Sequence, residues 1–328
     1  MKQFISFVVR CFPLLASLVL LPLLSYAGGT EGAVPFNFLF MDAGARPAAL
    51  GGAYAAAAND ANALSYNPAG LAAFEPGHII YYRQADKAEC LIPVKPDRQN
   101  HAVFQHTGHF QGVTREYGAL SLKNGFGFML NTVSFGDIRR TTLSNPRGTG
   151  LGAFGIRDWE VSLGYGRSYL EGLIGLGAAV KYLYEKIDTE SAHAAAADFG
   201  AMFYLDNFGL PLVLGVSAQN FGTKVRFKNT GEELPTNVRT GLAYYFSGIG
   251  LFVADVNLPG HGNPTVHFGG EYTPLERLAL RLGYNGRNDA GGVTAGIGIK
   301  ISRFSADYAF VPYGDLGSSH QLSVSCRW

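Results

Sequence analysis

The sequence predicts an all-β protein, a closed antiparallel transmembrane β-barrel of about 14 strands with a small helical or irregular N-terminal hatch inside the lumen. Three observations support this fold. The chain begins with an export signal, its composition is low in charge, and from residue 101 onward apolar residues alternate with small or polar ones. Lipid covers the outside of such a barrel and water or a plug fills the inside, so its strands alternate with a period of two.

Residues 1–27 have the features of a secretory signal peptide. Lys2 and Arg10 give a basic start, 12–24 is an apolar core, and small residues end at Ala27. The core is shorter than the roughly 20 residues of a membrane-spanning helix. We therefore expect cleavage after Ala27.

The composition favours a membrane barrel over a soluble domain. Of the 328 residues, 47% are hydrophobic and 16% are charged, against about 25% charged in soluble domains. The chain also holds 43 glycines, 23 phenylalanines and 17 tyrosines. A net charge of +1 provides no basic face for nucleic acid, so outer-membrane lipid is the expected partner and nucleic acid is not.

Fourteen segments between residues 101 and 328 carry the period-two pattern, and single-chain bacterial barrels have an even number of strands. We place the strands near 101–107, 115–122, 126–136, 158–166, 173–185, 196–205, 212–219, 236–246, 249–257, 265–272, 277–285, 291–301, 303–311 and 319–328.

The connections between these strands alternate between short and long. The short ones are 123–124, 167–172, 206–211, 247–248, 273–276 and 302. The long ones are 108–114, 137–157, 186–195, 220–235, 258–264, 286–290 and 312–318. Outer-membrane barrels have short periplasmic turns and longer external loops. The pattern therefore predicts a bacterial outer-membrane location with both termini periplasmic.

Aromatic residues on the expected lipid face gather near strand ends, as in the girdles at membrane interfaces. Those at outer ends are Trp159, Tyr182, Tyr184, Tyr284, Tyr308 and Phe310, and those at inner ends are Tyr165, Tyr244, Phe246, Tyr272 and Trp328. The alternative is that aromatic residues simply favour strands. In the last strand, Leu322, Val324 and Trp328 form an apolar series that ends on an aromatic residue, which resembles the assembly signal of outer-membrane barrels.

Residues 28–76 are rich in alanine and glycine and form the expected hatch. Its candidate functional residues are Arg46, Asp60, Asn62, Asn67, Pro68, Ala69, Gly70 and Leu71. Asp60 is a candidate N-cap for one helical turn, and Asn67-Pro68 would end that turn. We expect Arg46 to reach a carboxylate of the barrel wall.

The stretch from Gly44 to Leu71 resembles the start of the PorV/PorQ family, relatives of the long-chain fatty acid transporter FadL. The segment 104–122 resembles that family's first strands, and 305–328 resembles its last hairpin. The resemblance implies a fourteen-stranded barrel with an N-terminal hatch.

Residues 77–100 depart from the family pattern. A strand within them would make the count odd, so we interpret the segment as an insertion at the periplasmic rim or in the hatch. Cys90, in this insertion, and Cys326 are the two cysteines outside the signal. We expect both to stay unpaired, because the alternation points Cys326 at lipid.

Polar residues expected to face the lumen are Glu160, Lys181, Asp198, Arg239, Asp255, Glu271, Arg281, Lys300 and Asp307. Because charges inside a barrel need partners, we expect them to pair with one another and with the hatch. The alternative is a role in ligand selectivity.

No catalytic residue, metal site or cofactor is predicted, so the protein is not expected to be an enzyme. His101, His106 and His109 are interpreted as polar rim residues, because a metal site needs defined geometry and usually a fourth donor. The glycine-rich segment 150–155 has no helix after it, so it does not match a dinucleotide-binding motif.

Two functions from different classes remain. The first is a plugged, FadL-like channel for small hydrophobic molecules, opened by movement of the hatch. The second is a docking or accessory barrel of a protein secretion system, as the resemblance to PorV and PorQ in type IX secretion implies. The sequence contains no feature that decides between them.

Overall fold

A computed structural model describes residues 35–72, 80–82, 90–92, 99–227, 230–246, 249–275, 277–287 and 291–328. The signal peptide expected at residues 1–27 lies outside this part of the chain, and its cleavage stays a prediction. None of the helices in these segments has the length and apolar character needed to cross a membrane.

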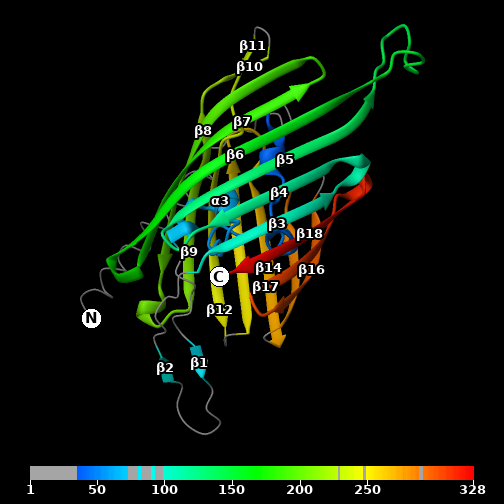
Figure 1. Ribbon diagram of the computed structural model, residues 1–328. Helices are drawn as coiled ribbons and strands as arrows, with labels where there is room; N and C mark the ends of the chain where they lie inside the picture. Colours follow the sequence, from blue (N-terminus) through cyan, green and yellow to red (C-terminus); the bar gives the residue numbers. More distant parts are fainter. Residues whose placement is uncertain are drawn as a thin grey trace.

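Fourteen antiparallel strands form a closed barrel (Figure 1). They are β3 (His101–Gly108), β4 (Thr114–Ser121), β5 (Phe126–Arg139), β6 (Ala153–Tyr169), β7 (Ile174–Ile187), β8 (Glu190–Tyr204), β9 (Leu212–Gly222), β12 (Asn237–Phe246), β13 (Gly250–Pro259), β14 (Thr265–Leu275), β15 (Leu278–Asn285), β16 (Gly292–Ile301), β17 (Phe304–Pro312) and β18 (Ser318–Arg327). Each pairs with its neighbours in sequence, and β18 pairs with β3 from His320↔Gly108 to Arg327↔His101. The predicted fold and strand count are confirmed.

One predicted connection is wrong. The segment 186–195 was expected to be a long loop, but β7 continues to Ile187 and β8 begins at Glu190, so only two residues join them. The strands β5 to β8 contain 14, 17, 14 and 15 residues and reach beyond their neighbours (Figure 1). Because the chain here extends the sheet instead of forming a loop, the strict alternation of short and long connections fails at this point.

The two ends of the barrel differ. We call the end that carries the C-terminus and the turns 122–125 and 302–303 the C-terminal rim. The opposite end, with the connection 140–152, is the loop rim. Trp159, on the outward face of β6, lies with its ring 5.5 Å from Tyr182 and 5.3 Å from Tyr184. This group sits several residues inside the strands, because β6 and β7 continue past it.

The outward and inward faces of the wall follow the predicted alternation. On β18, Leu322 and Val324 are 53% and 49% exposed, whereas Gln321 and Ser323, which alternate with them, are almost fully buried. Outward positions around the barrel are largely leucine, isoleucine, valine and aromatic residues. This arrangement presents an apolar band to the surroundings and a polar wall to the lumen.

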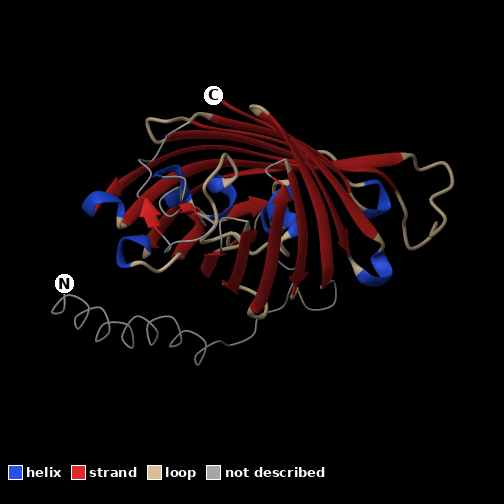
Figure 2. Cartoon of the chain, turned by 90° about the horizontal axis from the view of Figure 1, so that it is seen from below, coloured by secondary structure: helices blue, strands red, loops and turns tan. Residues whose placement is uncertain are grey.

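The N-terminal segment 35–72 fills the lumen, and the strands enclose its short helices (Figure 2). These are η2 (Asn37–Phe40), α2 (Ala45–Ala49), α3 (Ala63–Tyr66) and η3 (Pro68–Ala72). The stretch between α2 and α3 has no regular structure, yet almost all of it is buried. We call 35–72 the hatch.

Small residues on both sides let the hatch backbone lie directly against the wall. A Cβ placed on Gly177 of β7 would overlap with the carbonyl of Pro68, and one on Gly215 of β9 would overlap with that of Ala55. Alanine is the commonest residue in the buried part of the hatch. At these positions the backbones of the hatch and the wall are in direct contact.

Two small sheets lie outside the barrel sheet. β1 (Ile80–Tyr82) pairs with β2 (Cys90–Ile92), and β10 (Val225–Phe227) pairs with β11 (Thr230–Glu232) in the connection from β9 to β12 (Figure 1). Because β1 and β2 pair with each other and not with a barrel strand, the segment 77–100 leaves the barrel count at fourteen.

The close approach at Gly177 can be tested with Gly177→Ala. The added methyl would push η3 away from the wall, and overpacking of this kind costs about 1–3 kcal/mol. The variant should lose its heat-modifiable migration on gels at a lower temperature. Gly270→Ala is the control, because a Cβ there meets no atom within 4 Å. Equal behaviour of the two variants would show that the hatch does not lie against β7.

Candidate functional site

Wall side chains complete the backbone hydrogen bonds of the irregular part of the hatch. Asp255 Oδ2 on β13 accepts from the backbone N–H groups of Tyr54 and Ala55, both at 2.8 Å. Arg239 Nη1 on β12 donates to the carbonyl oxygen of Gly52 at 2.8 Å. Buried backbone groups need partners, and this stretch forms no helix or strand that would supply them. These two predicted lumen residues hold the centre of the hatch.

Neutral polar residues of the wall also bind backbone groups of the hatch. They are not among the lumen residues predicted from the sequence. Gln105 Oε1 accepts from Gly44 N–H at 2.6 Å, and Thr294 Oγ1 donates to the Ala49 carbonyl at 3.0 Å. Further contacts of this kind come from Ser217, Gln219, His267 and Ser323, and the cation Arg115 donates to the carbonyls of Met41 and Asp42. All lie on the inward face of their strands, so the period-two pattern held the signal that a search for charges missed.

The Asn67-Pro68-Ala69-Gly70-Leu71 motif anchors the end of the hatch. Asn67 Nδ2 donates to the carbonyls of Ala55 and Ala201, at 2.8 and 3.2 Å, and Asn67 Oδ1 accepts from Ala69 N–H at 3.0 Å. α3 ends before Asn67, whose backbone is extended, as Asn-Pro predicts. Pro68 begins η3, which packs on β6, β7 and β8, and a Cβ on Gly70 would overlap with the Ala58 carbonyl. Leu71 lies against the glycines of β5 and β6.

An ion-pair network joins the hatch to β14, β15 and β17. Arg46 of α2 binds Glu271 with two hydrogen bonds, Nε to Oε2 at 2.9 Å and Nη2 to Oε1 at 3.0 Å. Arg281 Nε also binds Glu271 Oε2, at 2.6 Å, and Arg281 Nη1 binds Asp307 at 2.7 Å. Two guanidinium groups thus neutralise two wall carboxylates at the C-terminal side of the hatch, in the fork geometry that suits carboxylates.

Asp60 does not cap α3, as the sequence suggested. Asn62 precedes the helix, and no side chain caps it. Asp60 instead accepts hydrogen bonds from the Tyr54 hydroxyl at 2.8 Å and from Asn62 N–H at 2.9 Å, with Arg46 3.8 Å away. Burial pushes the pKa of the Asp60 carboxyl upward, but the charges of His101 and Arg46 and these hydrogen bonds hold it below its ordinary value.

Three of the predicted lumen charges pair within the wall. Lys181 Nζ lies 2.8 Å from Asp198 and 3.4 Å from Glu160, and all three side chains are buried. Lys181 also donates to Asn220 Oδ1 at 3.0 Å. This group links β6, β7, β8 and β9 and contributes charge balance within the wall.

His101, His106 and His109 contact different partners and do not form a cluster. His101 Nδ1 accepts from Ala61 N–H at 2.8 Å, His106 pairs with Glu116 on the outward face, and His109 packs against Tyr313 at the loop rim. Among the described residues, no group of three or more histidine, cysteine or acidic side chains could hold a metal ion.

An apolar cluster closes the lumen on the loop-rim side. Phe36 and Phe38 of the hatch are 1% and 2% exposed and pack with Leu183, Val133 and small residues of β8. Phe36 adopts a left-handed backbone conformation, with φ at 58° and ψ at 34°, and its N–H donates to Glu185 Oε2 at 2.8 Å. A non-glycine residue in this conformation carries strain that its surroundings must hold.

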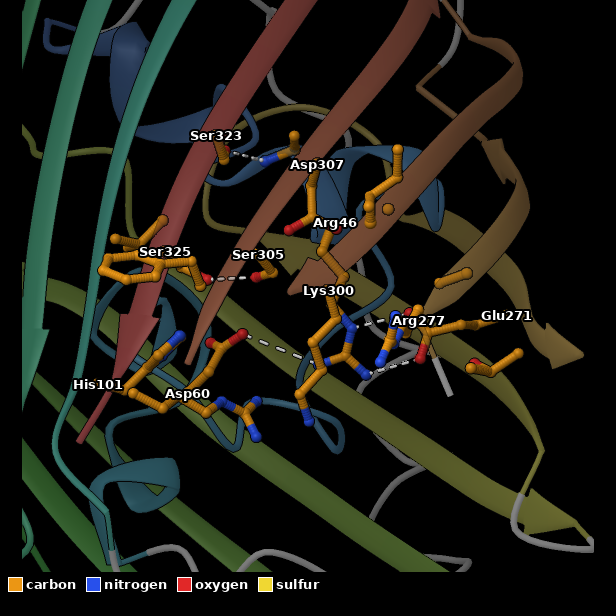
Figure 3. A pocket seen from close by; sticks show the side chains of 18 of the residues that line it. Arg46, Asp60, His101, Glu271, Arg277, Lys300, Ser305, Asp307, Ser323 and Ser325 are labelled. Carbon is orange, nitrogen blue, oxygen red and sulfur yellow. Dashed lines mark hydrogen bonds and ion pairs between the residues drawn. The ribbon is translucent and has the colours of Figure 1, made fainter. Parts of the chain in front are cut away.

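A cavity of about 680 Å³ lies on the other side of the hatch, at the C-terminal rim (Figure 3). Hatch residues Arg46 and Asp60 form its floor, and the ends of β14 to β18 form its wall. Lys300, the last predicted lumen residue to be placed, points into this cavity (Figure 3). The hatch therefore separates an apolar cluster at one end from a polar cavity at the other.

The last predicted site residues are those of the expected assembly signal in β18 and at the C-terminus. Leu322, Val324 and Trp328 are all about half exposed on the outside of the barrel. Cys326 is a free thiol on the same strand, and the side chain of Cys90 lies outside the described residues.

Several solved structures are similar to this chain in fold. A mutant of the monoaromatic hydrocarbon channel TodX aligns with a TM-score of 0.58 at 15% identity, over 87% of this chain and 98% of its own. The toluene transporter TbuX of Ralstonia pickettii gives 0.54 at 11% identity, over 87% and 97%. A FadL homologue of Pseudomonas aeruginosa gives 0.50 at 13% identity, over 92% and 99%.

No family model matches the sequence, and no curated protein sequence matches it. The similarity to FadL-type barrels is therefore one of fold and rests on the solved structures. The resemblance to PorV and PorQ has no independent support.

The link between Arg46 and Glu271 can be tested with Glu271→Gln. The substitution removes the negative charge that Arg46 and Arg281 share. The expected loss of folding free energy is about 2 kcal/mol, because water in the cavity screens these charges in part. Hydrogen exchange of amides 44–58 should accelerate, because the hatch loses an anchor. Asp188→Asn is the control: it breaks an exposed pair with Arg140 at the loop rim and should leave exchange in the hatch unchanged. Unchanged exchange in Glu271→Gln would contradict the anchoring role.

Proposed function

We propose that this protein is a channel of a bacterial outer membrane that admits small hydrophobic molecules and that the hatch closes it. The observation that carries the proposal is the filled lumen, in which an irregular alanine-rich segment separates an apolar cluster from an open polar cavity. The fold that this chain shares with hydrocarbon and toluene channels supports the same function.

The outward face supports a membrane location. It is an apolar band, and the backbone groups of every barrel strand pair within the closed sheet. Only helices and closed barrels can satisfy their backbone groups in hydrocarbon. Lipid is therefore the first partner in this proposal, and both termini would lie on the periplasmic side, because the C-terminal rim carries the short turns.

The apolar cluster at the loop rim is the proposed site of first binding. Phe36 and Phe38 fill it in the closed state, and their aromatic rings have the size and polarity of a small hydrocarbon. A ligand that takes their place releases the left-handed conformation at Phe36, so part of the cost of moving the hatch is offset. Binding and opening are thereby coupled.

Several contacts at the centre of the hatch are single hydrogen bonds that water would replace if the hatch moved. The contacts of Asp255, Gln105, Thr294 and Arg239 are to backbone groups, and the wall opposite them is mostly glycine. Each such bond contributes only about 0.5–1.5 kcal/mol net when water can substitute. The hatch can then move without unfolding the barrel.

No enzymatic activity is part of this proposal. The PorV/PorQ type stays a proposal that rests on the sequence resemblance at 44–71, 104–122 and 305–328. A docking role in secretion rests on that resemblance alone.

A reversible crosslink between hatch and wall tests the channel. Ala45 N–H donates to Ser323 Oγ at 2.9 Å, so Ala45→Cys with Ser323→Cys places two thiols side by side, in a Cys90→Ser/Cys326→Ser background. Cells that express the oxidised variant should take up toluene at the rate of cells without the barrel. Reductant should restore the rate of the uncrosslinked protein, because the hatch is then free to move.

The matched controls are each single cysteine variant, which cannot crosslink and should transport like the parent. Uptake by the oxidised double variant at the parent rate would refute a hatch that must move. A parent rate no higher than that of cells without the barrel would refute transport of this class of molecule.

A further inference from the structure

The cavity at the C-terminal rim carries a net positive charge that has no role in the proposed channel function. Six basic side chains and three carboxylates line it. The basic residues are Arg46, Arg277, Arg281, Lys300, Arg303 and Arg327, and the carboxylates are Asp60, Glu271 and Asp307. The formal balance is +3, in a protein whose whole chain has a net charge of +1. The excess is therefore local to this cavity.

The three carboxylates are already taken by two of the six cations. Arg46 contacts Glu271 and Asp60, and Arg281 contacts Glu271 and Asp307. Within the described part of the chain, no ion pair involves the side chains of the remaining rim residues Arg277, Lys300 and Arg303. These three side chains add positive charge that no described carboxylate pairs with.

The strands place like charges next to one another. Lys300 N–H donates to the Arg277 carbonyl at 2.9 Å, so these two residues are cross-strand neighbours at the ends of β15 and β16. In the same way, Arg327 N–H donates to the Arg303 carbonyl at 2.9 Å beside β17 and β18. Like charges on neighbouring strands destabilise a sheet. An anion bound between Arg277 and Lys300 would relieve their repulsion.

The geometry of the cavity suits a small anion. Its volume of about 680 Å³ lies within the range of small-molecule sites, roughly 300–1,000 Å³. Hydroxyl groups of Ser305, Ser323 and Ser325 line the same cavity on β17 and β18, and Ser305 is the cross-strand neighbour of Lys300 (Figure 3). Guanidinium groups bind carboxylates and phosphates through paired hydrogen bonds, and a concave wall of one sign concentrates counter-ions.

We propose that this cavity is a binding site for a small multivalent oxyanion, a polycarboxylate or a phosphate, that enters from the solution at the C-terminal rim. Arg277, Lys300 and Arg303 supply the attraction. Arg46 and Arg281 stay with their carboxylates and form the fixed floor. In the closed state the hatch separates this site from the apolar cluster, so anion binding can be measured without hydrocarbon transport.

The test is titration calorimetry of the full-length mature barrel in a non-ionic detergent at low salt, with citrate, inorganic phosphate and acetate as ligands. Citrate or phosphate should bind with measurable heat, and acetate at least about tenfold more weakly, because a single charge gains less from three cations. Whichever of citrate and phosphate binds with the higher affinity shows whether the natural ligand is a polycarboxylate or a phosphate. Affinity should fall as salt is added.

The variant that decides the proposal is the triple change Arg277→Gln, Lys300→Gln and Arg303→Gln. It should weaken binding of the tighter ligand by about tenfold or more, a change that corresponds to roughly 1.4 kcal/mol. Lys123→Gln is the matched control, because this exposed lysine lies in a turn of the same rim but does not line the cavity. An unchanged thermal unfolding temperature shows that the triple variant is folded.

Three results would overturn the proposal: no binding of citrate or phosphate at low salt, equal affinity in the triple variant and the parent, or an equal loss in Lys123→Gln. Each is measured in solution without a membrane gradient. A channel that fails to transport hydrocarbons would leave these outcomes unaffected, so the two proposals fail separately.

Discussion

The structure depends on one requirement, that an irregular backbone enclosed by a barrel must find its hydrogen bonds on the barrel wall. Between α2 and α3 the hatch has neither helical nor strand pairing, yet its residues are almost fully buried. Asp255 receives two backbone N–H groups, and Arg239 and Thr294 donate to carbonyls. An unpaired buried backbone group costs about as much as a lost hydrogen bond. The polar lining of the lumen is therefore a structural necessity before it is a functional surface.

Small residues make this arrangement sterically possible. Positions such as Gly177 and Gly215 place the wall backbone next to the hatch backbone, so that wall side chains on either side can reach over it. Large side chains of the hatch, Leu50, Tyr54 and Tyr66 among them, fill the space that remains and pack in one apolar cluster with the wall. The centre of the hatch is therefore held by apolar packing as well as by polar contacts with the wall.

The hatch also gives the barrel two unlike ends. Phe36 and Phe38 gather the apolar contacts at the loop rim, whereas Arg46 faces the basic cavity at the C-terminal rim. A single N-terminal segment thus joins an apolar site to an electrostatic one, with a strained residue at the first and an ion-pair network at the second.

The sequence by itself determined the barrel: the fourteen strands, their inward and outward faces and the position of the hatch before them, because alternation with a period of two is a local property of each segment. It placed all fourteen strands but missed the extension of β7 and β8 through 186–195, where polar and alanine residues suit a loop and a sheet extension equally. Only the tertiary structure decided which wall group meets which hatch group. Tyr54 and Asp255 are 201 residues apart, and nothing local to either residue encodes a contact that forms only when the sheet closes around the segment.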